Sequence, residues 1–306
     1  MKIAVLGGGA MGGLFSAYLS RENEVTVIDV NKALVEKIVS DGLSLQETDG
    51  NTQIYHPDAT TNAAGRQPVD LVVLFVKAMF SEAALTANRD IIGKDTYLLT
   101  LQNGSGHEEM LSKFTDSAHI VIGATQHNAA VLDLGCIRHG GNGNTVIGSL
   151  THNSNRLQPI ADTFTACGLA CECCDNVQTL IWNKLFTNVT VSILTGVLQM
   201  PMGFILTDAA AWASCCQLLR EAVDVAAGLG MTFDYDEKLA ELKALCTRNA
   251  AGLTSIYADL RDGRRTEVDT ISGSIVRAAK QCGVPAPSHA LLVNLVHALE
   301  GKAARA

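Results

Sequence analysis

A lysine and an asparagine lie one helical turn apart in the segment TLIWNKLFTNVTVSIL, residues 179–194. Lys184 and Asn188 are spaced i, i+4, so a helix projects both side chains from nearly the same side. Both lie between the apolar face of that helix and its polar face. Two interpretations are open: a solvated lysine at the edge of an ordinary helix, because lysine is rarely buried unpaired, or a pair of site residues.

A glycine-rich turn near the start of the chain has the pattern Gly-x-Gly-x-x-Gly. It follows an apolar run typical of a buried strand at residues 2–6 and precedes a predicted helix at residues 11–19. In that order the first glycine makes a tight turn, the second admits a pyrophosphate, and the third lets helix and strand pack closely. The helix N-terminus adds partial positive charge for phosphates. We therefore predict a dinucleotide-binding loop rather than a purely structural turn. Its residues are Gly7, Gly8, Gly9, Ala10, Met11 and Gly12.

Asp29 ends a second β-branched run, at residues 25–28. A carboxylate at that point can accept both ribose hydroxyls of the adenosine and would repel a 2′-phosphate. The nearest following cation is Lys32. NADH is therefore favoured over NADPH as the cofactor, although an Asp that simply caps a helix starting near residue 31 is the alternative.

Further polar side chains follow predicted strands. Lys77 ends an apolar strand that begins at residue 69, and Asn103 follows another that begins at residue 96. Ligands of an open parallel sheet bind outside the carboxyl ends of its strands, which places both residues at the edge of the glycine loop. Segments 119–132 and 144–150 are predicted to hold the closing strands. His127 is an alternative acid–base group, but its flanks indicate a hairpin-like region.

The composition excludes several kinds of partner. The net charge is −8 and no long run of Lys and Arg occurs, so nucleic acid is not expected. Apolar residues make up 47%, yet no apolar run reaches the ~20 residues needed to span a bilayer. The apolar start imitates a signal peptide, but its glycines and strand pattern indicate otherwise. A cytoplasmic protein without membrane contact is expected.

Nine cysteines form an odd set with two adjacent pairs, which does not suit a disulfide framework. We interpret them as small buried hydrophobic residues in a reducing compartment. The CECC stretch at 171–174 suggests a metal cluster, but no second group of Cys or His follows at a suitable spacing. No metal site is predicted.

A length of 306 residues favours two domains. Strand signals stop near residue 175, and helical patterns follow at 178–198, 208–230, 236–246, 253–261, 268–282 and 289–302. The predicted fold class is therefore α/β. A Rossmann-type doubly wound sheet spans residues 1–175 and an all-helical substrate and catalytic domain spans 176–306. The substrate is expected between the two, and a homodimer could form through the helical half.

The segment 250–276 contains two more candidates. Ser255 and Asp259 are one helical turn apart, and Glu267 follows a basic turn and opens a predicted helix. A glutamate in the first turn of a helix is also a common partner of the helix dipole, which is the alternative for Glu267.

In this order, the motifs resemble the ketopantoate reductase (2-dehydropantoate 2-reductase) family over essentially the whole chain: the glycine loop, Lys77, QNG, WNKLFTN and TSIYADLRDGRRTEVDTISG. The resemblance implies that Lys184 is the catalytic acid and that Asn103 and Glu267 support cofactor and catalysis. It also implies that Ser255 binds substrate, that Asn188 faces the cleft, and that Lys77 lies by the cofactor.

The chemistry agrees with that resemblance. Reduction of a 2-oxo acid needs a hydride at the carbonyl carbon and a proton at its oxygen, and a lysine ammonium can polarise the oxygen and release the proton. Glu267 could hold the ammonium and tune its pKa, while the nicotinamide supplies the hydride. The default reaction is ketopantoate to pantoate in pantothenate biosynthesis.

The chain departs from the family pattern near the expected substrate pocket. Ketopantoate-specific members carry asparagines where this chain has Ser192, Met202 and Gly252. Loss of hydrogen-bonding amides weakens recognition of a polyhydroxylated substrate, and Asp29 departs from the family's general preference for NADPH. The close alternative is an NADH-dependent enzyme for an apolar branched or aromatic 2-oxo acid.

Two other classes remain open. Enzymes of the 6-phosphogluconate type also use a Lys-x-x-x-Asn pair on a helix, but that pattern lacks the later TEVD element. A nucleotide-binding protein without catalysis would keep the glycine loop but would not need Lys184 or Glu267, and both are present.

Overall fold

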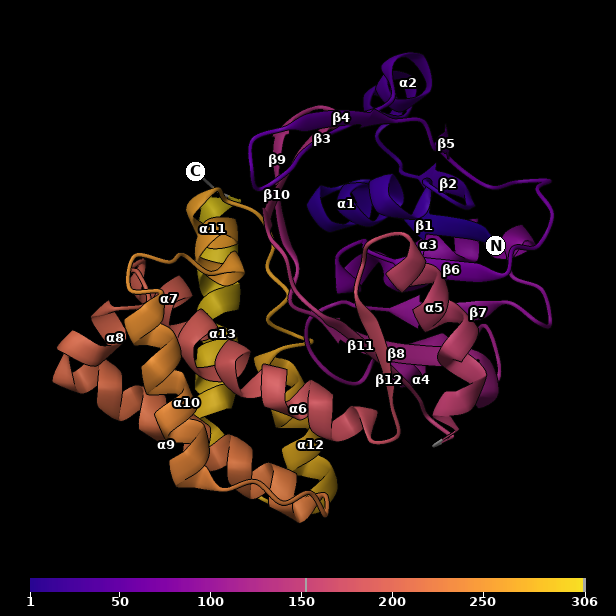
Figure 1. Cartoon of the computed structure of the whole chain (residues 1–306). Coiled ribbons are helices and arrows are strands. Elements are labelled where there is room, and N and C mark those ends of the chain that lie inside the picture. The colour runs from indigo at the N-terminus through magenta and orange to yellow at the C-terminus, as the bar shows by residue number, and fades with distance from the viewer. Residues whose placement is uncertain (152, 305–306) are drawn as a thin grey trace. The chain divides into compact units, whose positions relative to one another are not determined.

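A computed structural model of the chain describes residues 1–151 and 153–304 (Figure 1). The chain forms two compact units. The first consists of Met1–Gln102 and His107–Val177, and the second consists of Asn103–Gly106 and the residues from Gln178 onward. The first unit is built on a mostly parallel sheet and the second is helical. The predicted fold class is confirmed.

The main sheet of the first unit has eight strands, and every neighbouring pair is parallel except β8 and β11. Its central strands β1 and β6 are short apolar runs buried on both faces, as a sheet covered on two sides requires. Across the sheet the strands are β12 (Cys171–Cys174), β11 (Thr145–Ser149), β8 (Ile120–Thr125), β7 (Tyr97–Thr100), β6 (Leu71–Leu74), β1 (Lys2–Leu6), β2 (Glu24–Ile28) and β5 (Asp58–Thr60).

A second sheet of four strands was not anticipated from the sequence. Its order is β4 (Thr52–Tyr55), β3 (Leu43–Gln46), β10 (Cys136–Gly141) and β9 (Asn128–Asp133). Strands β9 and β10 form the predicted hairpin, so the segment 119–132 holds two strands in different sheets rather than one closing strand. The short, half-exposed strands carry too few apolar residues to stand out in the sequence.

Helix α1 lies between the two sheets and contacts β1 and β2 on one side and β3, β9 and β10 on the other (Figure 1). This position explains why nearly all of its residues are buried. The helices of this unit are α1 (Ala10–Leu19), α2 (Lys32–Asp41), α3 (Ser81–Ala87), α4 (His107–Leu111) and α5 (Gln158–Ala166). Four short 3₁₀ turns accompany them, η1 (Ala78–Phe80), η2 (Arg89–Ile91), η3 (Ser117–His119) and η4 (Ser154–Leu157).

The second unit packs its helices around one apolar core that includes Trp182, Phe186, Leu219 and Ile275. Side chains fix where its longer helices begin: Asp208 caps α9, and the Glu221 carboxylate accepts the first backbone N–H groups of α13. The helices are α6 (Val177–Thr187), α7 (Ile193–Leu198), α8 (Phe204–Thr207), α9 (Ala209–Gly228), α10 (Tyr235–Arg248), α11 (Ser255–Arg261), α12 (Ser272–Cys282) and α13 (Pro287–Ala303).

The predicted single helix over 178–198 is not continuous. A π-helical turn, η5 (Asn188–Ser192), separates α6 from α7. Thr190 and Thr195 donate hydroxyl hydrogen bonds to backbone carbonyls four residues earlier, and such bonds commonly distort helices. Wide turns of this kind often lie at functional sites.

No helix within residues 1–151 and 153–304 is both long and apolar enough to cross a membrane.

We expect Gly12→Ala to lower the free energy of unfolding by about 1–3 kcal/mol, as overpacking does. The added Cβ would overlap the carbonyl oxygen of Gly7, where strand β1 and helix α1 pack most closely. Urea unfolding measures the effect. Gly9→Ala is the matched control, because a Cβ there meets no atom within 4 Å; equal losses in both variants would contradict this packing role.

Candidate active site

The glycine loop joins β1 to α1 and gives each glycine a different environment. Gly7 has a φ of +99°, and a Cβ on it would lie 2.7 Å from the backbone nitrogen of Val76. Gly9, by contrast, faces open space and precedes the first turn of α1, whose N–H groups have no intrahelical acceptor. Crowding at the turn and open space at the helix N-terminus fit a dinucleotide pyrophosphate.

Asp29 lies at the end of β2 and holds the loop beside it. One carboxylate oxygen accepts the Gly8 N–H at 2.7 Å and the other accepts the Asn31 N–H at 2.8 Å. Helix α2 is capped by the side chain of Asn31, which accepts hydrogen bonds from two backbone N–H groups of its first turn. The alternative interpretation of Asp29 as that helix cap is therefore wrong.

The nearest cation that follows Asp29 in the sequence is Lys32, on α2. The Lys32 side chain is exposed, and its Nζ lies 3.6 Å from the Glu36 carboxylate on the same helix. Lys32 therefore has a carboxylate partner on its own helix.

Lys77 follows β6 and precedes the 3₁₀ turn η1. Its segment is held by Gln102, a buried residue that sequence reasoning did not single out. The Gln102 amide donates to the Val76 carbonyl oxygen and, at 2.8 Å, to the Ser81 hydroxyl. Thr100 in turn donates to the Gln102 oxygen at 2.9 Å. The only sequence signal for Gln102 was its position beside Asn103 at a strand end.

Asn103 belongs to a short loop that packs with the second unit. Gly104 has a φ of +101°, and a Cβ on it would overlap the carbonyl of Thr270. The Ser105 N–H donates to that same carbonyl at 3.0 Å. The loop of Asn103 therefore lies directly against the segment that follows Glu267.

Glu267 lies before α12, not in its first turn, because that helix begins at Ser272. The backbone N–H groups of Thr270 and Ile271 donate to the Glu267 carbonyl at 3.1 and 3.0 Å. The dipole interpretation of Glu267 is therefore wrong, and the predicted helix over 268–282 starts four residues late. The segment is instead a turn that holds the carboxylate outside the helix.

Lys184 lies on α6 and is electrostatically coupled to Glu267. Burial lowers the pKa of the Lys184 ammonium, and the negative charge of Glu267 opposes that by raising it. A fully solvated lysine at the edge of a helix would show neither effect. A partly desolvated lysine with a carboxylate nearby is instead typical of a residue that exchanges protons.

Asn188 is the first residue of the π-helical turn, and its side-chain amide is only partly hydrogen-bonded. Its side-chain oxygen accepts the Ser192 hydroxyl at 3.4 Å, whereas its buried Nδ2 has no hydrogen-bond partner among the described residues. A buried donor left unpaired costs about 1–3 kcal/mol. An oxygen of a bound molecule would satisfy it.

Ser255 is the exposed first residue of α11. The preceding Thr254 caps that helix and shares a hydrogen bond of 2.8 Å with Thr195 on α7. The start of α11 is thereby tied to the helix that follows Asn188 and Ser192.

Two positions that depart from the family pattern are neighbours. The Met202 N–H donates to the Gly252 carbonyl at 3.0 Å, and a Cβ on Gly252 would lie 3.1 Å from the Met202 sulfur. Met202 is buried. The Met202 thioether therefore occupies the space beside Gly252.

His127 lies in a buried hydrogen-bonded network of the first unit. Its Nδ1 is 3.2 Å from Nε2 of His139, whose Nδ1 is 3.0 Å from Glu47. Tyr18 donates to the same carboxylate at 2.9 Å. Burial lowers the pKa of His127 and the neighbouring His139 adds to that. The network joins α1 to the small sheet.

The CECC stretch forms the edge strand β12, and all nine cysteines are free thiols. Among the described residues, no group of three or more His, Cys, Asp or Glu side chains is arranged to hold a metal ion.

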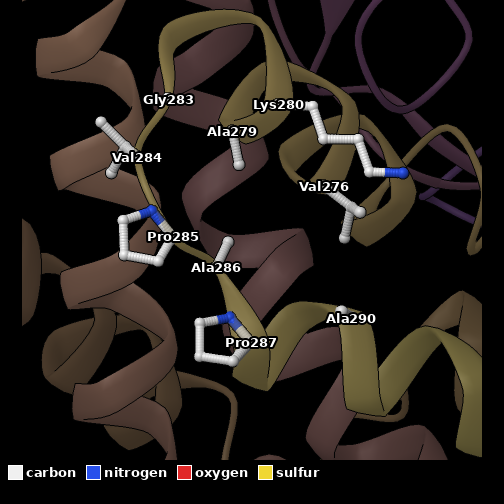
Figure 2. A pocket seen from close by; sticks show the side chains of 9 residues that line it. All are labelled: Val276, Ala279, Lys280, Gly283, Val284, Pro285, Ala286, Pro287 and Ala290. Carbon is white, nitrogen blue, oxygen red and sulfur yellow. The ribbon is translucent and has the colours of Figure 1, made fainter.

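A separate hollow of about 420 Å³ lies where α12 turns into α13 (Figure 2). Its wall is apolar, with Pro285 and Pro287 on one side and the Lys280 ammonium at its rim. None of the predicted site residues lines it.

Comparison with known proteins identifies the family of the chain. Residues 3–152 match the model of the family described as ketopantoate reductase PanE/ApbA, and residues 176–300 match the model of its C-terminal domain. The chain belongs to the ketopantoate reductase family. The 2-dehydropantoate 2-reductase of Pyrococcus abyssi is 30% identical over 99% of this chain and its own full length. That of Halobacterium salinarum is 28% identical over 97% of this chain and 98% of its own.

Solved structures of the family agree over the whole chain. A ternary structure of D-mandelate dehydrogenase with NADH and anilino(oxo)acetate superimposes with a TM-score of 0.92 and 31% identity, covering 99% of each chain. A ketopantoate reductase from Ralstonia eutropha gives a TM-score of 0.90 and 27% identity over 99% of each chain. The chain is therefore an NAD(P)-dependent oxidoreductase of this family.

We expect Asp29→Asn to reduce the ratio of kcat/KM with NADH to that with NADPH by roughly tenfold, about 1.4 kcal/mol. The amide keeps an oxygen for one of the two N–H groups, of Gly8 or Asn31, that the carboxylate accepts. It removes the charge that repels a 2′-phosphate. Initial rates with both cofactors measure the ratio. Asp41→Asn, at the far end of α2, is the control for a lost negative charge; an unchanged ratio in Asp29→Asn would contradict the assignment.

Proposed function

We propose that this protein reduces a 2-oxo acid to the 2-hydroxy acid with a nicotinamide cofactor, and that 2-dehydropantoate is its first candidate substrate, giving pantoate. Residues 1–175 would form the cofactor-binding domain and residues 176–306 the catalytic domain. The single observation that carries the proposal is Lys184, a lysine whose pKa is lowered by burial and which feels the charge of Glu267. The names of the relatives support the substrate.

Lys184 would act as the general acid. As the carbonyl carbon gains a hydride, negative charge develops on its oxygen, and an ammonium group beside that oxygen stabilises the charge and transfers a proton. The lowered pKa makes the proton easier to give at neutral pH, while Glu267 keeps enough of the amine charged. Bound NADH or NADPH supplies the hydride.

Substrate would be held by polar atoms of the second unit. The unpaired Nδ2 of Asn188 can donate to a carboxylate or carbonyl oxygen. The Ser192 hydroxyl fixes the orientation of that amide, and Ser255 adds a hydroxyl at the start of α11. Asn103 would support the cofactor and the catalytic pair, since its loop packs on the segment after Glu267.

The cofactor would bind along the glycine loop. The open space at Gly9 and the first turn of α1 suit the pyrophosphate, and Asp29 suits the ribose hydroxyls of NADH. Lys77, in the segment between β6 and η1, would add positive charge beside the phosphates or the nicotinamide ribose. We therefore propose NADH as the preferred cofactor.

One observation favours a second candidate substrate, an apolar branched or aromatic 2-oxo acid. Met202 packs against Gly252, so this wall offers a thioether rather than amide donors. Such a wall binds apolar groups and gives little recognition of hydroxyl groups. The D-mandelate dehydrogenase that superimposes on this chain is named for an aromatic 2-hydroxy acid.

We expect Lys184→Ala to lower kcat by at least about 100-fold, the scale of a lost general acid, with nearly unchanged NADH binding. In the unmodified protein, kcat for reduction should fall as the pH rises through the lowered pKa of Lys184, below the ordinary lysine value of about 10.4. Stopped-flow turnover and NADH titration measure these effects. Lys280→Ala, at the rim of the separate hollow, is the control; full turnover by Lys184→Ala would remove that residue from the mechanism.

A substrate panel tests the choice between the two candidates. NADH oxidation would be measured with ketopantoate, 2-oxoisovalerate, 2-oxoisocaproate and phenylglyoxylate, for the unmodified protein and for Met202→Asn combined with Gly252→Asn. The double variant should raise kcat/KM for ketopantoate relative to phenylglyoxylate by at least about tenfold, because it restores hydrogen-bonding amides. A fall in that relative value would contradict the role given to Met202 and Gly252.

A further inference from the structure

The loop that carries Glu267 is fastened to α13 on both sides of that residue. The backbone N–H and the hydroxyl of Thr266 both donate to one oxygen of Glu300, each at 2.7 Å. Two residues after Glu267, a carboxylate oxygen of Asp269 lies 3.0 Å from Nε2 of His297. The position of Glu267 along this loop is therefore set by contacts with α13.

His297 joins the two fastenings. Its Nδ1 lies 3.0 Å from the second oxygen of Glu300, and its Nε2 lies 3.0 Å from Asp269. A carboxylate can only accept a hydrogen bond, so both ring nitrogens must carry a proton for both contacts to be favourable. That state is the imidazolium cation. A neutral imidazole has one unprotonated nitrogen, which can only accept a hydrogen bond. The contact of that nitrogen with its carboxylate would therefore be repulsive and would be lost.

The groups around His297 favour its charged form. The hydrogen bond to Glu300 raises the pKa of His297 most, and Asp269 raises it further against the effect of burial. Burial raises the pKa of Glu300, but the hydrogen bonds from Thr266 and His297 outweigh this and keep it below the ordinary value. Arg277 on α12 also contacts this segment, where it donates to the Asp269 backbone carbonyl at 2.8 Å.

We propose that His297, as an imidazolium clasp between Asp269 and Glu300, is a positioning residue that holds the Glu267 carboxylate beside the Lys184 ammonium during turnover. This inference rests on the proposed function for its catalytic consequence. The clasp is complete below the ordinary histidine pKa of about 6.5. It is lost as the pH rises through the raised pKa of His297 in the folded protein.

Two replacements of His297 separate charge from shape. His297→Gln is neutral at every pH. It offers one NH2 group and one carbonyl oxygen in place of two ring N–H groups, so one carboxylate would face an acceptor and the clasp should be lost throughout. His297→Arg keeps a permanent positive charge and several N–H donors that can serve two carboxylates. His119→Gln is the control, because His119 also pairs with an acid three residues away but lies in the first unit.

Steady-state kinetics over pH 5.5–9.5 provide the first readout. We expect His297→Gln to lower kcat roughly tenfold below pH 6.5 with little change in KM for NADH, the scale of a modest displacement of a catalytic group. His297→Arg should retain kcat and hold it to higher pH than the unmodified protein. A His297→Gln variant with the kcat and pH profile of the unmodified protein would overturn the proposal.

Hydrogen exchange provides a second readout that does not depend on activity. The amides of Thr270, Ile271 and Gly273 are hydrogen-bonded within the Glu267 turn, and they should exchange at least about tenfold faster in His297→Gln but not in His119→Gln. Faster exchange with unchanged kcat would reduce His297 to a structural role and overturn the proposal. If the unmodified protein reduces no 2-oxo acid, the proposed function fails. The clasp is then tested by hydrogen exchange alone. Its loss at high pH should make exchange at these amides rise more steeply with pH in the unmodified protein than in His297→Arg, and equal pH dependence in both would overturn the clasp.

Discussion

The proposed chemistry depends on keeping one lysine partly out of water while a carboxylate holds its charge. Burial alone would drive Lys184 toward its neutral form, which could not donate a proton, and full exposure would leave its pKa too high for easy proton transfer. The charge of Glu267 offsets part of the effect of desolvation on the Lys184 pKa. The distance between these two groups is therefore the quantity that the surrounding structure must control.

That control comes from loops rather than from regular elements. Glu267 lies in a turn before α12, and its neighbours Thr266 and Asp269 are bonded to α13. The loop of Asn103 packs on the same turn, where Gly104 leaves room for the Thr270 carbonyl. A loop can place a carboxylate at an angle that no helix position offers, but it needs such external fastening to hold it there.

The two halves of the proposed reaction are supported differently. The proposed cofactor site at the glycine loop and Asp29 would take its shape from backbone crowding: Gly7 and Gly12 have no room for a side chain, whereas Gly9 faces open space. The proposed substrate wall would instead depend on the residue types at two positions, Met202 and Gly252, which are hydrogen-bonded neighbours. Backbone crowding tolerates little change, while a wall of this kind changes with single substitutions. The cofactor chemistry and the substrate identity can therefore diverge within one fold.

The sequence by itself determined the fold class, the glycine loop and the order of the motifs that carry the family resemblance, because these depend on local spacing and on hydrophobic periodicity. It did not reveal the small sheet, whose short strands leave a weak pattern, nor the π-helical turn at Asn188. It placed Glu267 in a helix that begins only at Ser272. It also allowed Asp29 as a helix cap, because propensity does not show which of two nearby side chains accepts the first backbone N–H groups of a helix. Gln102 and His297 emerged only from the tertiary structure, because Ser81 and Asp269, with which they form hydrogen bonds, lie far from them in the sequence and no local pattern marks such contacts.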